Sequence, residues 1–495
     1  MRSSFAALVL PAAALALASC AQSPEVDHPS LGDVDVPAQW AALELLDEKE
    51  RAEGSYEASP WWRRFNRPDL DGIIARVLER NHDLRAAAER VFAAAAQARI
   101  AGADAAPQIA AVFDASRTRQ NFIGLPIPGA SGGVLSTHFT SLGVALDLTW
   151  ELDLWGRIRA GRSAALADLE ATYADVEAAR LSLVGQAVKL WLGALEAAEQ
   201  VELAEATLAN YRATHETIVD RYERGLRPAI DVRFSRASIA SAEAALASRL
   251  DDLDAIRRQI EVLAGDYPSG SIGADMRTLP EVPEVVPVGL PSDLLLRRPD
   301  ISSAERRLQA AGARVLEARR AFFPRVSLTT SGGTSSNELE DLVDPDFAVW
   351  TLAGNLIQPL FQGGRLRSNL ELAESREREL VEGYLATVLD AFREVESALA
   401  AESYLARRED ALDTAARESL AARDLAEERY ARGLDDILTV LEAQRRAFES
   451  RSQLLLVRRL RLENRADLHL ALGGDWLGPR TQSDMALEND TRNTP

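Results

Sequence analysis

The sequence has a single cysteine in 495 residues, which is Cys20. A lone cysteine excludes an intrachain disulfide and any metal site that needs two cysteine ligands. Aromatic residues are also scarce, at 6%, although hydrophobic residues as a whole reach 47%. A chain that is rich in alanine and poor in aromatic side chains favours long, closely packed helices over a globular enzyme core.

Positively charged residues are outnumbered: the sequence has 56 lysines and arginines and 76 acidic residues, which gives a net charge of −20. This balance argues against a nucleic-acid partner, which needs a clustered basic surface. The five histidines are dispersed, and neither a phosphate-binding glycine loop nor a nucleophile elbow is present. The sequence therefore predicts no enzyme, no metal site and no cofactor.

Long hydrophobic runs are missing after the N-terminus. Residues 5–17 are apolar but too short for a membrane-spanning helix, and with the positive start they predict a secretory signal peptide. Residues 17–20 (LASC) resemble the bacterial lipobox, so Cys20 is predicted to be lipidated, and Ala21 favours export to the outer membrane. An ordinary signal peptide with an incidental cysteine is the alternative. A chain of this kind can cross a membrane only as a β-barrel.

An internal repeat is the most informative feature that the sequence does contain. Residues 221–226 (RYERGL) return as residues 429–434 (RYARGL). Residues 156–159 (GRIR) return at the same distance as residues 364–367 (GRLR). The chain is therefore predicted to contain two copies of one structural unit.

Each copy predicts the same order of elements, which is a helix, two strands joined by a loop, a very long helix and a shorter return helix. In the first copy the first helix, the loop and the return helix fall on residues 69–104, 121–136 and 229–264. In the second copy they fall on residues 292–321, 335–346 and 435–472. The long helices follow from runs without proline and from apolar residues at coiled-coil spacing. This spacing alone is equally typical of a coiled-coil rod.

The predicted strands distinguish these possibilities, because apolar and polar residues alternate along residues 138–150 and 347–356. Such alternation is typical of a sheet with one apolar and one polar face. Leu142, Val144, Leu146 and Leu148 form the predicted apolar face of one strand. Four strands cannot close a barrel, because the smallest usual barrels have about eight. A membrane-spanning sheet would therefore require an oligomer.

Three motifs, at residues 150–157 (WELDLWGR), 289–300 (GLPSDLLLRRPD) and 359–365 (PLFQGGR), resemble TolC-like outer-membrane factors. The similarity is to the lipoprotein branch, OprM- and NodT-like, of resistance-nodulation-division efflux systems. It implies a mainly α-helical fold with a membrane β-barrel. The expected homotrimer has a twelve-stranded barrel above a long α-helical barrel. The implied partners are outer-membrane lipid, a periplasmic adaptor (membrane fusion protein) and an inner-membrane resistance-nodulation-division transporter.

The resemblance also implies a periplasmic gate at the hairpin tips. Its tyrosine and partner aspartate correspond to Tyr430 and Asp231, and its constriction to Leu438 and Glu442. A second acidic ring of some members is absent, because Thr439 stands there. Asp435 likewise replaces an arginine that ties the tips together in some members. We expect Leu438 and Glu442, four residues apart, to share one helix face. Three converging Glu442 carboxylates would favour cations and raise their own proton affinity.

The predicted organisation is a signal peptide (1–19), a lipidated linker (20–60), two repeats (61–278 and 279–478) and a polar tail (479–495). The predicted function is a passive, gated duct, the outer-membrane channel of a tripartite efflux pump that exports small molecules. A duct of a type I protein secretion system is the nearest alternative. A lipid-anchored periplasmic coiled-coil scaffold is an alternative of another class, but it leaves the four strands unexplained.

Overall fold

The computed structural model describes residues 36–46, 60–122, 135–273, 278–283, 288–289 and 291–476. The predicted signal peptide, Cys20, the tail at 479–495 and the centre of the first loop, residues 123–134, lie outside the described residues. The chain forms two compact units. The strand unit contains Val91–Ala171 and Glu305–Gly383, and the hairpin unit contains Leu31–Arg90, Thr172–Ala304 and Tyr384–Pro495.

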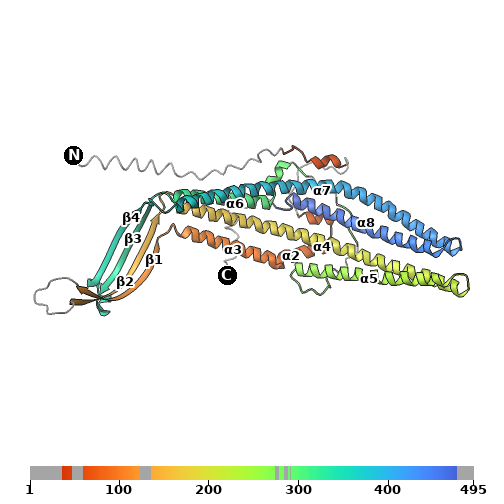
Figure 1. Ribbon diagram of the computed structural model, residues 1–495, viewed down its shortest axis with the longest axis horizontal. Coiled ribbons are helices and arrows are strands. Elements are labelled where there is room, and N and C mark those ends of the chain that lie inside the picture. The colour runs from red at the N-terminus through yellow and green to blue at the C-terminus, as the bar shows by residue number, and fades with distance from the viewer. Residues whose placement is uncertain are drawn as a thin grey trace. The chain divides into compact units, whose positions relative to one another are not determined.

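The strand unit contains a four-stranded antiparallel sheet (Figure 1). The strands are β1 (Gln108–Phe122), β2 (Leu135–Leu152), β3 (Arg325–Ser336) and β4 (Ala348–Ile357). Their spatial order follows the chain, so β1 and β4 are the edge strands. Because β2 pairs with β3, the sheet joins the hairpin of one repeat to the hairpin of the other. Neither outer edge has a partner strand within the described chain.

The register places most of the large apolar residues of the four strands on one face. Leu146 pairs with Ala111 on β1 and with Gly332 on β3, and Gly332 pairs with Trp350 on β4. Directly paired residues of antiparallel strands point to the same side. The large apolar side chains that this face exposes are Ile109, Phe113, Val144, Leu146, Trp350, Leu352 and Leu356. The opposite face is more polar: Asp147 pairs with Ser331, and Ser331 pairs with Thr351, although Val112, Phe139, Val349 and Ile357 are also exposed there.

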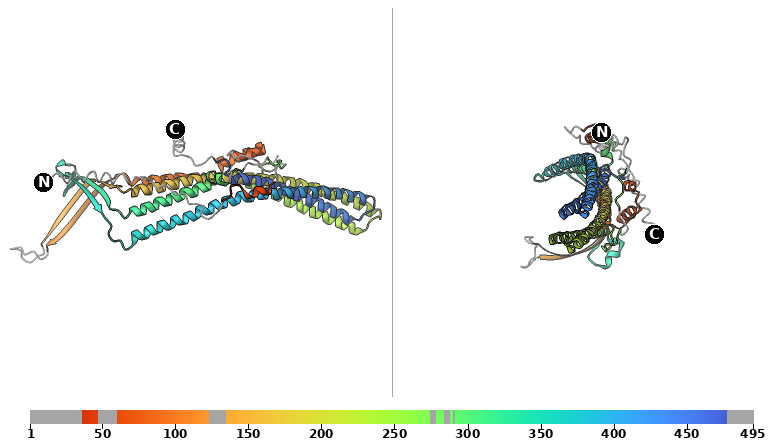
Figure 2. Two further views of the ribbon diagram at one scale, coloured as in Figure 1. Left: turned by 90° about the horizontal axis from the view of Figure 1, so that it is seen from above. Right: turned by 90° about the vertical axis from the view of Figure 1, so that its right-hand side faces the viewer.

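Two helical hairpins dominate the hairpin unit, with α5 running back beside α4 and α8 beside α7 (Figures 1 and 2). The long members are α4 (Arg157–Glu223) and α7 (Arg365–Ala431), which have 67 residues each. A helix of that length extends for about 100 Å. The return helices α5 (Ala229–Leu263) and α8 (Ile437–Ala471) have 35 residues each. Both long helices begin in the strand unit and end in the hairpin unit.

The repeated RYxRGL motif ends both long helices in the same way. Leu226 N–H donates to the Arg221 carbonyl at 2.9 Å, and Leu434 N–H donates to the Arg429 carbonyl at 3.0 Å. The intervening Gly225 and Gly433 have φ of 73° and 75°. These are Schellman motifs, which need a residue in the left-handed region that glycine adopts without strain. The repeat in the sequence is therefore a repeated helix stop.

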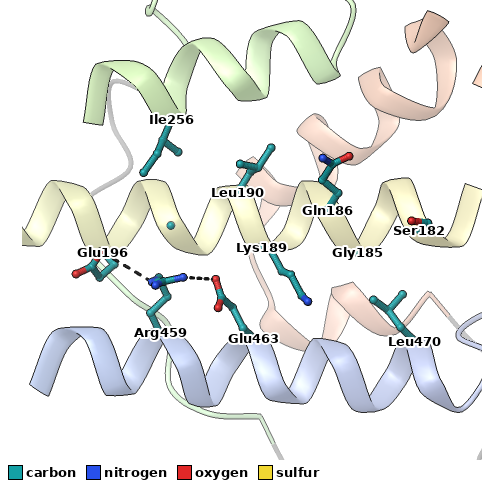
Figure 3. A pocket seen from close by; sticks show the side chains of 11 residues that line it. Ser182, Gly185, Gln186, Lys189, Leu190, Glu196, Ile256, Arg459, Glu463 and Leu470 are labelled. Carbon is teal, nitrogen blue, oxygen red and sulfur yellow. Dashed lines mark hydrogen bonds and ion pairs between the residues drawn. The ribbon is translucent and has the colours of Figure 1, made fainter. Parts of the chain in front are cut away.

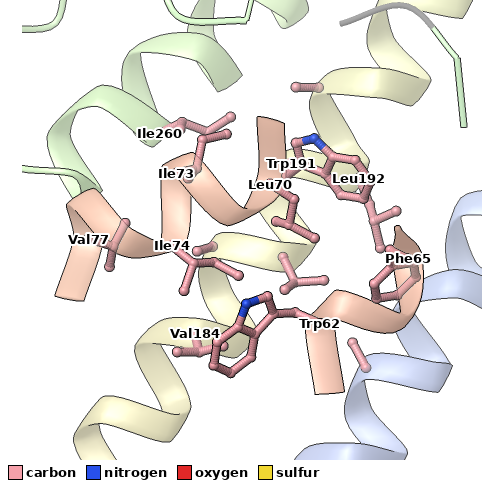
Figure 4. Packing of buried hydrophobic residues seen from close by; sticks show 14 of the residues in the cluster. Trp62, Phe65, Leu70, Ile73, Ile74, Val77, Val184, Trp191, Leu192 and Ile260 are labelled. Carbon is pink, nitrogen blue, oxygen red and sulfur yellow. The ribbon is translucent and has the colours of Figure 1, made fainter. Parts of the chain in front are cut away.

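The core of the hairpin unit lies where short elements pack on the two long helices. In the first repeat, the 3₁₀ helix η3 (Trp61–Phe65) and α2 (Pro68–Arg80) pack on α4 (Figure 4). Trp191 of α4 is fully buried there, and its indole N–H donates to an Asp69 carboxylate oxygen at 3.0 Å. The second long helix is covered partly from outside its own repeat, because Trp40, beside the 3₁₀ helix η1 (Ala41–Leu45) that precedes the first repeat, packs against Phe392 of α7.

The predicted first helix, 69–104, is wrong in one respect, because Asn81 divides it into α2 and α3 (His82–Ala103). The Asn81 side chain accepts a hydrogen bond from Leu84 N–H and donates one to the Leu263 carbonyl, both at 2.9 Å. It therefore caps a new helix while binding the end of α5. Sequence periodicity continued across this break and did not reveal it.

The predicted helix at 292–321 also starts too early. Residues Pro291–Leu296 form the 3₁₀ helix η4, and α6 runs from Pro299 to Arg320. Proline at the first helical position is favourable, whereas the residue before a proline is disfavoured in helical conformation. The predicted loop at 335–346 contains two 3₁₀ turns, η5 (Glu340–Val343) and η6 (Pro345–Phe347).

Candidate functional site

The ends of the two hairpins bind each other through arginines of the first. Arg221 donates to the backbone carbonyls of Tyr430, at 2.7 Å, and of Ala431. Arg227 donates to the Asp435 carbonyl at 3.0 Å. The last carbonyls of α7 have no partners within the helix, and they lie at the negative end of the helix dipole. Arg221 of one tip therefore caps the helix of the other, and Arg227 binds the turn that follows this helix.

Tyr430 lies beneath these arginines, whose guanidinium carbons are 5.0 Å (Arg221) and 4.7 Å (Arg227) from the centre of its ring. The side chain is 3% exposed and packs against Ile218, Val232 and Ile437. Burial raises the pKa of Tyr430. Its hydroxyl makes no hydrogen bond in the described part of the chain. The predicted bond from Tyr430 to Asp231 is therefore not formed within one chain, and it stays a prediction for neighbouring subunits.

A polar relay joins the hairpins one level above the tips. The Gln444 amide of α8 donates to the Thr214 hydroxyl of α4 and to a Glu427 carboxylate oxygen of α7, both at 2.8 Å. Asn210 of α4 donates to the same Glu427 oxygen at 3.1 Å. Gln444 is 3% exposed, so these bonds form largely away from water. The relay fixes α4 against both helices of the second hairpin.

Asp435, at the position where the resemblance implies a tethering arginine in some members, has its charge compensated within its own tip. Arg429 donates to both Asp435 carboxylate oxygens, at 2.7 and 3.1 Å. These hydrogen bonds lower the pKa of Asp435. Positive charge for tethering comes from the first hairpin instead, through Arg221 and Arg227.

Glu442 and Leu438 lie on one face of α8, as predicted from their spacing, and both line one hollow. Leu438 is 53% exposed. Arg445 contacts both Glu442 carboxylate oxygens at 3.0 Å, and Arg446 contacts one at 2.7 Å. Hydrogen bonds from Arg445 and then Arg446 lower the pKa of Glu442 to about 2. Within one chain these arginines act against the raised proton affinity predicted for a ring of Glu442 carboxylates.

Two hollows of similar size lie among the described residues of the hairpin unit. The first has a volume of about 610 Å³ and lies along α4 and α8 (Figure 3). Its charged groups are already paired, with Lys189 Nζ 2.5 Å from Asp467 and Arg459 in contact with Glu463. The second, of about 590 Å³, lies between α4, α5 and α8 near the tips and is the one that Leu438 and Glu442 line.

Within the described residues there is no cluster of three or more side chains suited to hold a metal ion. None of the described helices combines the length and the hydrophobicity of a membrane-spanning helix. The structural features that remain to be explained are the four-stranded sheet with an exposed apolar face and the paired tips.

Comparison with known proteins decides the family. The sequence pattern of outer membrane efflux proteins matches residues 73–266 and 290–474. The chain belongs to the outer membrane efflux protein family. The outer membrane protein OprJ of Pseudomonas aeruginosa is 34% identical over 472 residues, which cover 94% of each chain. The toluene efflux pump outer membrane protein TtgI of Pseudomonas putida is 33% identical over 470 residues, which cover 94% of this chain and 97% of TtgI.

The fold of this efflux protein agrees with solved structures of the family. The open-state MtrE channel of Neisseria gonorrhoeae superposes with a TM-score of 0.77 and 30% identity, covering 93% of this chain and 100% of MtrE. The predicted TolC-like fold is thereby confirmed. The predicted function as the outer-membrane channel of a tripartite efflux pump is also confirmed. The family is one of channel proteins and not of enzymes.

Several residues of the tips escaped the sequence analysis. Arg221 belongs to the repeated motif and Arg227 follows it, but the motif predicts only the duplication and the position of the two tips, and not which arginines bind the other hairpin. Gln444, Thr214 and Asn210 lie on helix faces that resemble any solvated coiled coil.

Proposed function

We propose that this outer-membrane efflux protein acts as a passive, gated duct, built by three copies and anchored by lipid at Cys20. A periplasmic adaptor and an inner-membrane resistance-nodulation-division transporter would complete the pump, and the transporter would supply the energy. The observation that carries the proposal is the four-stranded sheet with one apolar face and two open edges. Three such sheets give the twelve strands of a closed barrel.

A deletion strain tests the duct directly. Loss of the gene should sensitise the bacterium to small toxic compounds, and the intact gene should restore resistance. A type I secretion duct would instead leave resistance unchanged and abolish the export of a protein. Purified protein that forms no channels in planar bilayers, and that stays monomeric, would support the coiled-coil scaffold.

The lipid anchor gives the first prediction. Replacing Cys20 by alanine should leave a chain that is not lipidated and that associates less firmly with the membrane, because acyl chains add an anchor beside the barrel. Mass spectrometry of the mature protein measures the modification, and membrane fractionation measures the association. Cys20 without a lipid in the wild-type protein, or a mature chain that still starts at Met1, would contradict the proposal.

The apolar face of the sheet gives the second prediction. Replacing Leu146 by arginine should destabilise the folded channel by about 2–4 kcal/mol if this position lies at the bilayer midplane. Leu146 is 60% exposed and lies beside Gly332, so the cost would come from the lipid and not from a crowded neighbour. Ser331→Arg, on the opposite face of the sheet, is the matched control. Equal yields of both variants as folded trimers in liposomes would mean that the apolar face does not contact lipid.

The gate is proposed to lie at the tips, with Leu438 and Glu442 at the constriction and Tyr430 and Asp231 in the contact that closes it. The arginine caps and the Gln444 relay support this, because they hold the two hairpins of one chain together where a duct would narrow. Opening would require the hairpins to separate, and each of these bonds opposes that separation.

The charge at Glu442 gives the third prediction. The wild-type channel should favour cations, and replacing Glu442 by glutamine should remove this preference, because Arg445 and Arg446 would keep their charges. Since the pKa of Glu442 is about 2, the carboxylate stays ionised and wild-type selectivity should not change from about pH 4 to about pH 8. Reversal potentials in planar bilayers measure both effects. Identical selectivity in the two proteins would place Glu442 outside the ion path.

A further inference from the structure

The hollow between α4, α5 and α8 has an unusual lining for a contact between helices. Small residues of α5, among them Ala237, Ala242 and Ala245, line it together with Leu441 and Phe448 of α8. Small and large side chains of packed helices usually interdigitate and leave little space. Here they leave about 590 Å³, within the range of about 300–1,000 Å³ of small-molecule sites.

Aromatic and apolar groups form the walls. Tyr211 of α4, Phe234 of α5 and Phe448 of α8 each contribute a ring, and Leu438 and Leu441 add aliphatic surface. Phe234 and Leu438 are 39% and 53% exposed, so the hollow is open to entry. Rings on three helices suit a flat apolar molecule, which gains from stacked or edge-to-face contact with each ring.

The charged groups that line the hollow already pair with one another, so they do not favour a charged ligand. Glu442 is bound by Arg445 and Arg446, and Arg445 also contacts Glu449 at 2.9 Å. An ion would therefore compete with existing pairs for its contacts. The Thr207 and Ser241 side chains can bind a weakly polar substituent.

A helix of a second copy is the other occupant to consider. A helix with its side chains is about 10–12 Å wide, so even two turns exceed the volume of this hollow. We propose that the hollow is a binding site for uncharged aromatic molecules. That such molecules are exported cargo, held beside the constriction at Leu438, rests on the proposed function, whereas their binding does not.

Binding of N-phenyl-1-naphthylamine, an uncharged aromatic amine whose fluorescence rises in apolar surroundings, tests the proposal on the purified full-length protein. Wild type should bind it saturably above a detergent blank. Ala242→Phe places a phenyl group in the hollow and should weaken binding by at least about tenfold. Ala244→Phe, at an exposed α5 position that does not line the hollow, should leave the affinity within about twofold.

Phe448→Ala removes one wall without filling the space and should weaken binding several-fold, so it decides the matter if Ala242→Phe does not fold. Wild-type affinity in both Ala242→Phe and Phe448→Ala would overturn the proposal, as would equal weakening by Ala244→Phe. Planar-bilayer conductance of the same samples separates the two proposals. A conducting channel without binding in the hollow overturns only the site, whereas protein that binds the probe but never conducts overturns only the duct.

Discussion

Replacing Arg221 and Arg227 together by methionine should open the channel. Each arginine donates hydrogen bonds to carbonyls of the opposite tip, and both cover the Tyr430 ring. A hydrogen bond from a charged group contributes about 1.5–3 kcal/mol, and partial exposure of these side chains favours the lower value. Loss of both should shift the balance between closed and open states by about a hundredfold. Single-channel recordings in planar bilayers should show a large rise in open time.

Arg224→Met is the matched control, because Arg224 lies on the same turn but contacts only Asp220, at 2.8 Å on the exposed surface. Its conductance should equal that of the wild type. If the double variant also conducts like the wild type, the arginine caps do not hold the gate. Tyr430→Phe adds information about neighbouring subunits. The Tyr430 hydroxyl has no partner in its own described chain, so this change affects gating only if another copy supplies one.

Replacing Glu402 by alanine should destabilise the hairpin unit by about 3–5 kcal/mol, the usual cost of breaking a buried ion pair. Glu402 of α7 is 2% exposed and Arg465 of α8 is 4% exposed, and their charged groups are 3.0 Å apart. Arg461 donates to the same carboxylate at 2.9 Å. The substitution removes the carboxylate that pairs with the buried Arg465 guanidinium group and one of the two carboxylates that pair with Arg461. The denaturant midpoint of helix unfolding measures the loss.

Glu371→Ala serves as the control for this experiment. Glu371 pairs with Arg367 at 3.1 Å, but both side chains are largely exposed, and such pairs contribute about 0.3–0.5 kcal/mol. Its midpoint should be nearly that of the wild type. Similar midpoints for the Glu402 and Glu371 variants would show that water reaches the Glu402 pair.

The sequence predicted the elements whose signal is local and repeated. Alternation in β2 and the runs without proline before Gly225 and Gly433 identified strands and long helices, because periodicity depends only on which face is buried. The division at Asn81 was missed because its cause is a distant contact, with the Leu263 carbonyl. The position of Glu442 on a helix face followed from spacing alone. Its low pKa depends on the side-chain conformations of Arg445 and Arg446, which spacing does not determine.

The tips show the same limit more sharply. The repeated motif predicted that two equivalent turns exist, and glycine explained how each turn ends its helix. Nothing in the motif distinguishes an arginine that binds the opposite tip from one that faces water, since Arg221 and Arg224 both lie at the exposed end of a long helix, each beside an acidic residue. The two arginines differ only in their contact with the other hairpin, which lies about 208 positions away in the sequence. A contact over that distance cannot be recognised from the neighbouring residues.

The two open edges of the sheet have a genetic consequence. In the proposed trimer each edge strand finds its partner on another chain, so no chain can complete its own barrel. A variant that folds its hairpins but cannot pair β1 with a neighbouring subunit would still join trimers and would prevent their barrels from closing. With equal amounts of both chains in one cell, only about one assembly in eight would contain wild-type copies alone. Such alleles should be dominant over the wild type, whereas alleles that prevent the chain from folding at all should be recessive.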